Sequence, residues 1–527
     1  MNFRDPLGAL REPATIRARC AAVTRAVEEG RSGHFKLDRS RLPDLAQRAA
    51  VLAREHFADL KTPHLGQWGR FGAGGLDRKG ELDALLAPRF PAERLHAHID
   101  LTVVSVLLGA GAGRAWRYVE RPELDALALP VHRQKGEDLL AMLGAAAGKA
   151  PAASTQAAAT APDTAEAPAT EPPVTETSTT EPPITEPPAT EPPVAQAHVP
   201  EAPAADPQPK LRQLATFSGT EGLSVAVFRA FVAGVFSSDP ADPLRVDALA
   251  LKRLDAAALR AVFQSSPSNP LPGLEARAAV LTHLGEVLQE QAERHGGLAR
   301  PARLIDSLSG AEGAPGLTAT QLLREVQRLH APAWISGSRV LGLPAGDVWP
   351  HLWAGAATDV TLAAADPGAG AAQRPTATDR ATAGWVPFHL LGQWMTYSLV
   401  EPLGWAGLQV SGLEALTALP EIALGARLVD AGVIVPRHPG DLTKTYKPSS
   451  DLVVEWRALT VTLMDELAGL VRELSEASAQ WEPSALNRGA AAPMRDLPLT
   501  LGLALLLGKP AEDAAPPLKI DSDGTLF

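Results

Sequence analysis

A proline-rich stretch interrupts the chain and cannot join a folded core. Residues 151–209 hold fifteen prolines and nine Asp or Glu residues, with no Lys, Arg or aromatic residue. Four copies of Thr-Glu-Pro-Pro begin at Thr170, Thr180, Thr185 and Thr190. Such a composition buries too little apolar surface to offset the entropy lost on ordering, and paired prolines with like charges favour an extended chain. We predict a disordered insert at 149–210, between an N-terminal helical part (1–148) and a helical core (211–527).

The insert also carries most of the net charge of the protein. The whole chain has a formal charge of −11, so the residues outside the insert are close to neutral. No basic stripe or basic tail is present, which argues against a nucleic-acid partner. A spacer is the commonest use of such a composition, and the proline motif also offers a docking site for a protein partner.

The cysteine content and the lengths of the apolar runs indicate the cellular compartment of the protein. Cys20 is the only cysteine, which excludes an intrachain disulfide and cysteine-based zinc sites and fits a reducing compartment. The N-terminus lacks the basic-then-apolar order of a signal peptide. The longest apolar run, Leu499–Gly508, is shorter than the roughly 20 residues that span a bilayer. We expect a cytoplasmic protein with no membrane partner.

Hydrophobic periodicity predicts a mainly α fold with minor β structure, because few stretches alternate with the two-residue period of strands. The expected helices are 16–29, 42–57, 92–108, 220–236, 255–264, 274–294, 318–330, 387–403 and 451–474. Residues 413–434 are expected to form a short helix, a turn and another short helix. The segment 355–383, rich in Ala, Gly, Thr and Asp, is expected to be a mobile loop.

The segment 384–403 carries a column of polar side chains. Pro387 suits the first turn of a helix, because its missing N–H would be unpaired there. His389, Gln393, Tyr397 and Glu401 recur every four residues and therefore share one face of that helix. Such groups are costly to bury unless each is paired. They line either a polar network in the core or a ligand pocket, and the sequence leaves both open.

Other polar groups have structural and functional interpretations. Asp239 and Asp242 precede prolines, which favours structural use in a turn. Asp347 has less structural reason to be where it is. Glu455 and Arg457 are two residues apart on a helix, so each needs a different partner.

The remaining motifs favour structural rather than catalytic roles. His96 and His98 would diverge on a helix and are read as surface histidines rather than metal ligands. The terminal Asp521 and Asp523 look like the first motif of haloacid-dehalogenase-type phosphatases, but that fold needs further catalytic groups downstream. A strand that ends in a turn is the better interpretation of this segment.

Several segments together resemble the uracil-catabolism protein 4 family, long classed as a domain of unknown function. They span nearly the whole chain outside the insert: 10–20, 73–77, 99–108, 116–118, 221–223, 236–247, 269–271, 384–389, 393–403, 452–460 and 522–525. The resemblance implies a role in degrading uracil, in a route where a ribosyl-urea species must lose its sugar. No metal or organic cofactor is implied.

The order of segments is also similar to that of the queuosine-salvage N-glycosidases, which implies a core like helix-hairpin-helix DNA glycosylases. A lysine and an aspartate sit around a helical hairpin in those enzymes, and their positions fall on Leu390 and Glu421. The chain departs from the family pattern at Leu390, at Ala383 where an aspartate is usual, and at 422–424, where Ile-Ala-Leu replaces Tyr-Arg-Asn. Apolar residues thus stand at all of these polar positions, which puts the activity in question.

The resulting functional prediction is hydrolysis of an N-ribosidic bond in ribosyl-urea or a nucleoside-like small molecule. A carboxylate can stabilise the positive charge that builds on the sugar, and Glu421 is the candidate acid/base group. At the start of a helix the same carboxylate would also suit the helix dipole. The predicted substrate-binding residues are His389, Gln393, Tyr397, Glu401, Asp239 and Asp347. The alternative is a catalytically degenerate paralogue that acts as a ligand-binding or scaffold protein.

Overall fold

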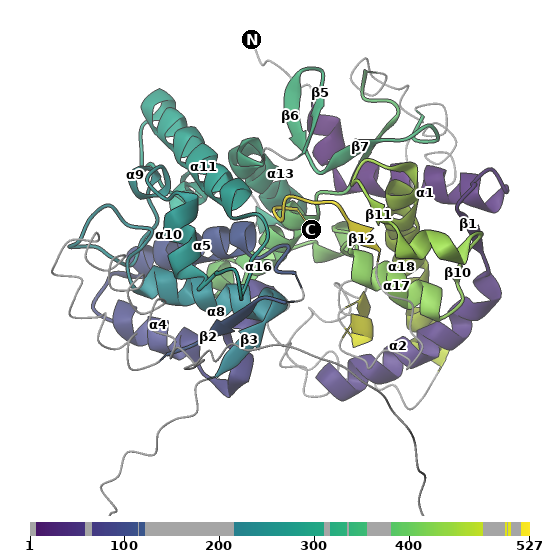
Figure 1. Cartoon of the computed structure of the whole chain (residues 1–527), viewed down its shortest axis with the longest axis horizontal. Coiled ribbons are helices and arrows are strands. Elements are labelled where there is room, and N and C mark those ends of the chain that lie inside the picture. The colour runs from purple at the N-terminus through teal and green to yellow at the C-terminus, as the bar shows by residue number, and fades with distance from the viewer. Residues whose placement is uncertain are drawn as a thin grey trace, which may run out of the picture. The chain divides into compact units, whose positions relative to one another are not determined.

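The computed structural model describes residues 7–57, 66–113, 115–121, 215–309, 317–334, 337–355, 381–477, 501–502, 504–506 and 518–526. The predicted disordered insert and nearly all of the predicted mobile loop lie outside these residues. The described residues belong to one unit built from both sides of the insert. Figure 1 shows it as mainly helical, which confirms the predicted fold class.

Helices make up most of the described chain. They are α1 (Pro13–Glu28), α2 (Leu42–Phe57), α3 (Gln67–Phe71), α4 (Arg78–Leu86), α5 (Pro91–Leu108), α8 (Gly219–Val232), α9 (Ala248–Leu251), α10 (Ala256–Val262), α11 (Leu274–His295), α12 (Leu304–Ser309), α13 (Ala319–His330), α16 (Leu390–Trp405), α17 (Ile422–Asp430) and α18 (Asp451–Ala477).

The β structure of the described residues consists of short pairs. The antiparallel pairs are β1 (Phe35–Leu37) with β10 (Ile434–Pro436), β2 (Arg117–Val119) with β3 (Thr216–Ser218), β5 (Ser338–Val340) with β6 (Leu343–Gly346), and β7 (Val348–Pro350) with β8 (Trp385–Pro387). The parallel pairs are β4 (Leu317–Thr318) with β9 (Val410–Ser411) and β11 (Thr445–Tyr446) with β12 (Lys519–Ile520). The pairs fasten loops to one another rather than forming a central sheet.

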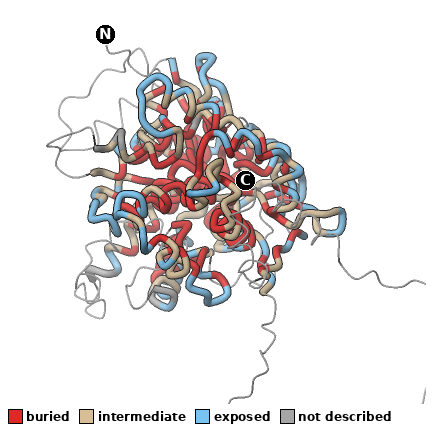
Figure 2. Tube along the Cα trace, turned by 90° about the vertical axis from the view of Figure 1, so that its left-hand side faces the viewer, coloured by how far each residue is buried: buried red, intermediate tan, exposed pale blue. Residues whose placement is uncertain are grey.

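Two groups of helices meet in this unit. The long helix α18 packs against α1, α2 and α17, on the right of Figure 1. Helix α5 packs against α8 and α16, and α13 also packs on α16, on the left. Apolar residues of both groups are buried, as the red interior of Figure 2 shows. Helices α1 and α18 contribute side chains to both large apolar clusters and so join the two groups.

The predicted helix 387–403 begins later than expected. Trp385–Pro387 is strand β8, which pairs with β7, so Pro387 does not lie in a first turn. The helix α16 starts at Leu390, after His389 in a left-handed conformation (φ 49°, ψ 43°). Of the described helices, none is both long and apolar enough to cross a membrane.

Candidate functional site

The site is built around the connection between α16 and α17, which ends at Glu421. A single 3₁₀ turn, η7 (Leu413–Ala415), opens this connection where a short helix was predicted. Glu421 is the N-cap residue of α17 and is half-buried, but its carboxylate does not cap the first-turn N–H groups. The Glu421 carboxylate forms no hydrogen bond or ion pair with the described residues. Burial raises the pKa of Glu421, and the positive charge of Arg70 offsets this only in part.

Helix α16 holds the middle of this connection through Thr417. The Gln393 amide donates to Thr417 Oγ1 (2.8 Å), and the Thr417 backbone N–H donates to Gln393 Oε1 (2.9 Å). The Tyr397 hydroxyl donates to the Thr417 carbonyl (3.3 Å). All three residues are buried. Gln393 and Tyr397 of the predicted polar column therefore lie on one face of α16, and both bond to Thr417 in the core.

Helix α1 holds the beginning of the same connection. The Arg17 guanidinium donates to the carbonyls of Ala415 (2.5 Å) and Leu416 (2.6 Å). Its Nε also pairs with Asp465 of α18 (2.8 Å), which fixes the arginine between two helices. Carbonyls in a turn without regular secondary structure need such donors when they are buried.

Helix α18 holds the residues on either side of Glu421. Arg457 Nε donates to the Pro420 carbonyl (3.0 Å), and Trp456 Nε1 donates to the Ile422 carbonyl (3.1 Å). The backbone of Glu421 is thus fixed from both sides, while its carboxylate has no hydrogen bond to any residue that the structure describes. We call the connection 413–422 with these donors the Glu421 clamp.

Asp347 anchors Arg457, one of the two arginines of the clamp. Its carboxylate accepts two hydrogen bonds from Arg457 (2.7 and 2.6 Å), one from Trp349 Nε1 (2.7 Å) and one from the Leu390 N–H (3.0 Å). Burial alone would raise the pKa of Asp347, but the charge and hydrogen bonds of Arg457 hold it below its usual value. These four donors occupy both carboxylate oxygens, so Asp347 supports the structure around the site.

His389 and Glu401 lie at opposite ends of α16. The His389 ring is buried, and its Nε2 lies 2.9 Å from the Leu10 carbonyl. Burial lowers the pKa of His389 to about 4, so the ring is neutral at pH 7. Glu401 is half-buried near the last turn of the helix.

Two predicted residues have contacts that suit structural roles. Asp239 lies in the turn between α8 and α9, where it accepts a hydrogen bond from the Ala241 N–H (2.9 Å) and pairs with Arg245 (3.6 Å). Glu455, on α18, accepts a bond from Ser32 Oγ (2.5 Å). The separate partners predicted for Glu455 and Arg457 are therefore present.

Arg70 is the residue of the site that the sequence analysis missed. It lies on α3, half-buried, with its guanidinium carbon 4.4 Å from the centre of the Trp394 ring of α16. Gly66 allows α3 to approach this closely, because a Cβ there would overlap Ser398 of α16. The available signal was an arginine between two aromatic residues in a glycine-rich stretch, at Trp68-Gly-Arg-Phe71.

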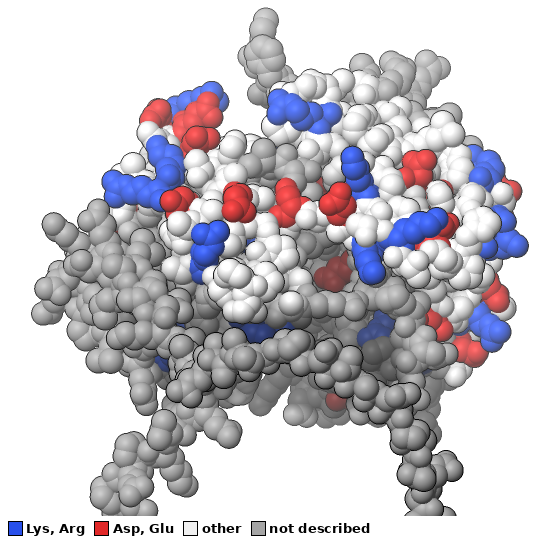
Figure 3. All heavy atoms as spheres, viewed as in Figure 1, with Lys and Arg blue, Asp and Glu red and all other residues white. Residues whose placement is uncertain are grey.

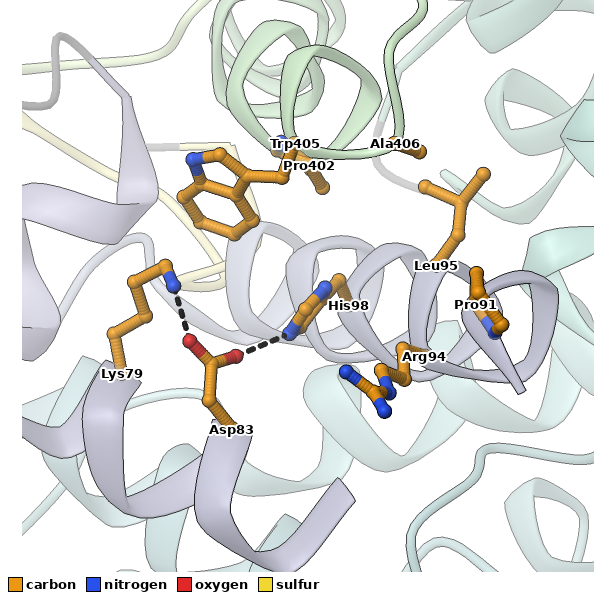
Figure 4. A pocket seen from close by; sticks show the side chains of 9 residues that line it. All are labelled: Lys79, Asp83, Pro91, Arg94, Leu95, His98, Pro402, Trp405 and Ala406. Atoms are coloured by element: carbon orange, nitrogen blue, oxygen red, sulfur yellow. Dashed lines mark hydrogen bonds and ion pairs between the residues drawn. The ribbon is translucent and has the colours of Figure 1, made fainter. Parts of the chain in front are cut away.

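A concavity of about 270 Å³ lies between α4, the start of α5 and the end of α16 (Figure 4). His98 is buried in its wall, so the prediction of a surface histidine is wrong for this residue. His98 Nε2 lies 3.1 Å from Asp83, and the ring packs edge-on against Trp68 and Trp405. Burial lowers the pKa of His98, and the negative charge of Asp83 offsets part of this decrease.

The C-terminal aspartates do not form an acidic site. Asp521 is exposed and directly follows β12, and Asp523 accepts hydrogen bonds from the Thr525 N–H (3.0 Å) and hydroxyl (2.6 Å). No group of three or more His, Cys, Asp or Glu residues within the described part could hold a metal ion. The strand-and-turn interpretation therefore accounts for this segment. On the face in Figure 3, basic and acidic side chains of the described residues are interspersed rather than gathered by sign.

Known proteins match the chain along most of its length. The family model described as a protein of unknown function (DUF1688) matches residues 9–140 and 208–527. The chain is 34% identical over 313 residues to Protein urg3 of Schizosaccharomyces pombe, which covers 59% of this chain and 68% of that protein. It is 24% identical over 559 residues to Uracil catabolism protein 4 of Lachancea kluyveri, which covers 100% of both. These matches confirm the family resemblance predicted from the sequence.

Proposed function

This chain belongs to the DUF1688 family, and we propose that it acts in uracil catabolism by hydrolysing an N-ribosidic bond. The name of its relative Uracil catabolism protein 4 supports the pathway. Glu421 supports the reaction type, because it is a half-buried carboxylate with a raised pKa and no protein partner in the described structure. Perturbed carboxylates of this kind are characteristic of acid/base sites.

The Glu421 clamp supplies what such a reaction needs from the protein. Breaking the ribosyl C–N bond builds positive charge on the sugar, and a fixed carboxylate stabilises that charge without having to reorganise. Glu421 then takes a proton from the attacking water. Hydrogen bonds to α1, α16 and α18 fix the backbone that presents it.

The other predicted residues enter this proposal in different ways. Gln393, Tyr397 and Asp347 support the clamp through the bonds described above. His389 and Glu401 are the members of the α16 column that remain proposed as ligand contacts. Asp239 is no longer needed, because its contacts hold a turn. The chemistry requires no cofactor, since water is the only co-reactant.

A product assay tests the proposal. The full chain and its Glu421→Gln variant would be incubated with ribosyl-urea and a panel of nucleosides, and released sugar would be measured by mass spectrometry. We expect release by the parent and a loss of about 10²–10⁴-fold in the variant. Glu414→Gln is the matched control, because Glu414 lies in the same connection and its backbone, rather than its carboxylate, is held by Arg17.

The stability of the variant separates catalysis from structure. Burial disfavours the ionised form of Glu421, so Glu421→Gln should unfold at the same temperature as the parent or a higher one. Equal sugar release by parent and variant would refute the role of Glu421. If the folded parent released sugar from none of the compounds, the protein would instead be assigned as a ligand-binding paralogue without catalytic activity.

One observation favours that second candidate. Leu390 occupies the position where the resemblance implies a lysine, and it packs half-buried against the apolar core at the start of α16. Ala383 and the start of α17 are also apolar where polar residues are implied. A binding protein that keeps the clamp but not the catalytic rate would show ligand affinity without sugar release.

A further inference from the structure

Arg70 has hydrogen-bonding capacity that the protein does not use. Its guanidinium carries five N–H donors, and its only hydrogen bond within the described structure is a long one, 3.5 Å from Nη1 to Gln67 Oε1. No carboxylate of the described residues lies within ion-pair distance of it. A half-buried guanidinium in this state is poised to bind a planar acceptor with two donors at once.

The orientation of Arg70 is fixed by neighbours that are themselves held in place. Its planar group stacks on Trp394, whose Nε1 donates to Gln67 Oε1 (3.2 Å). Gln67 is buried and donates from Nε2 to Ser105 (2.9 Å) and Ser224 (2.7 Å). The guanidinium is therefore held against a fixed indole ring, so a ligand would meet its donors without paying the full entropy of ordering them.

The surrounding charges decide which acceptor would bind. The carboxylates whose charges act on Arg70 are Glu421 and Glu221, the latter exposed in the first turn of α8. With both ionised, the three groups sum to −1, which disfavours a phosphate or carboxylate at this point. A neutral group that offers a carbonyl oxygen to the arginine and N–H donors to the carboxylates is complementary to all three.

We propose that Arg70 binds the carbonyl oxygen of a ureido group and serves as the leaving-group residue of the site. The inference rests on the proposed hydrolysis, and it assigns the role of Arg70 toward a ribosyl-urea substrate. As the C1′–N bond breaks, its electron pair passes to the ureido nitrogen and is delocalised onto the oxygen that Arg70 holds. The water oxygen bonds to C1′. The water proton passes through the Glu421 carboxylate to the departing nitrogen, which leaves as neutral urea.

The position of Arg70 gives a reason for catalysis as well as binding. The ureido oxygen carries more negative charge in the transition state than in the substrate, so the same hydrogen bonds become stronger as the reaction proceeds. Removing one such donor typically costs about 10²–10³-fold in kcat. The loss should therefore be larger in kcat than in KM.

Chemical rescue of a truncated variant tests this inference. Arg70→Ala should lose about 10²–10³-fold in kcat on ribosyl-urea, and added guanidinium chloride should restore part of the rate, whereas ammonium chloride at equal ionic strength should not. Arg70→Lys should stay well below the parent, because an ammonium lacks the planar pair of donors. Arg294→Ala is the control, since Arg294 pairs with Glu290 on the exposed face of α11.

Calorimetry separates this inference from the proposed function. If the parent releases no sugar, binding of ribosyl-urea to the parent but not to Arg70→Ala would still support the role of Arg70. Parent activity with an unchanged rate in Arg70→Ala would overturn the inference and leave the hydrolysis standing. Tighter binding of a ribosyl carboxylate than of ribosyl-urea would also overturn it. Should Arg70→Ala fail to fold, Arg70→Gln and Arg70→Lys give the same comparison.

Discussion

Two buried histidines should make the protein lose stability as the pH falls. His330 of α13 is fully buried and His389 nearly so, and burial lowers the pKa of each from 6.5 to about 4. The folded protein thus holds both rings neutral, whereas the unfolded chain takes up a proton on each near pH 6.5. Their stabilising effect is complete above that pH and declines as the pH falls toward 4.

The size of the effect follows from the difference between the two pKa values. A full shift from 6.5 to 4 corresponds to about 3 kcal/mol per ring, because one pKa unit is about 1.4 kcal/mol. Between pH 7 and pH 5, about 2 kcal/mol of this should be lost from the free energy of unfolding for each histidine. Carboxyls whose pKa values are raised by partial burial, such as Asp465, act in the opposite direction. The informative quantity is therefore the difference between parent and variant.

Urea denaturation at pH 7 and at pH 5 measures that difference. His330→Leu replaces the buried ring by an apolar side chain of similar volume that cannot be protonated, and His389→Asn introduces a residue that tolerates the left-handed backbone (φ 49°). Each variant should reduce the loss between the two pH values by about 2 kcal/mol. His295→Asn, exposed at the end of α11, is the control and should leave the loss unchanged. Variants with the same pH dependence as the parent would refute the reasoning.

Two further predictions concern the clamp. Asp347→Asn leaves the buried charge of Arg457 without its carboxylate and should lower the free energy of unfolding by about 3–5 kcal/mol in urea denaturation; a loss under 1 kcal/mol would contradict the buried ion pair. Gly425→Ala places a Cβ against the Trp456 indole. It should lower the free energy of unfolding by about 1–3 kcal/mol and also reduce sugar release. Gly273→Ala, strained at φ +72° and packed on a different segment, should lower the melting temperature while the folded protein keeps its rate.

Local periodicity was sufficient to locate most helices. The predicted bounds 42–57 coincide with α2, and 274–294 ends one residue short of α11, because both segments repeat their apolar residues at helical spacing. The prediction failed at Pro387, which ends the strand Trp385–Pro387 instead of opening the helix. Its partner, Val348–Pro350, is distant in sequence, and such a pairing leaves no periodic signal in a three-residue stretch.

The site shows a similar division between local and long-range information. That Gln393 and Tyr397 share a face follows from their spacing, but Thr417 as their common partner depends on how two elements pack. The roles of Arg17 and Arg457 as clamp donors were equally invisible, because both act on carbonyls. Backbone acceptors are present at every residue, so no pattern of side chains marks which of them will be used.

Because residue 390 is apolar, the cation that acts on Glu421 comes from another element than α16. Leu390 lies at the first position of α16, where its N–H donates a hydrogen bond to the Asp347 carboxylate. The described cation whose charge acts on Glu421 comes instead from α3, as Arg70. A guanidinium stacked on Trp394 stays charged at pH 7 and offers a planar pair of donors, which a lysine ammonium does not. Relative to the lysine that the resemblance implies at 390, Leu390 places no charge on α16, and the carboxylate has a cationic neighbour of different geometry. The rescue of Arg70→Ala by guanidinium measures whether that neighbour carries the reaction.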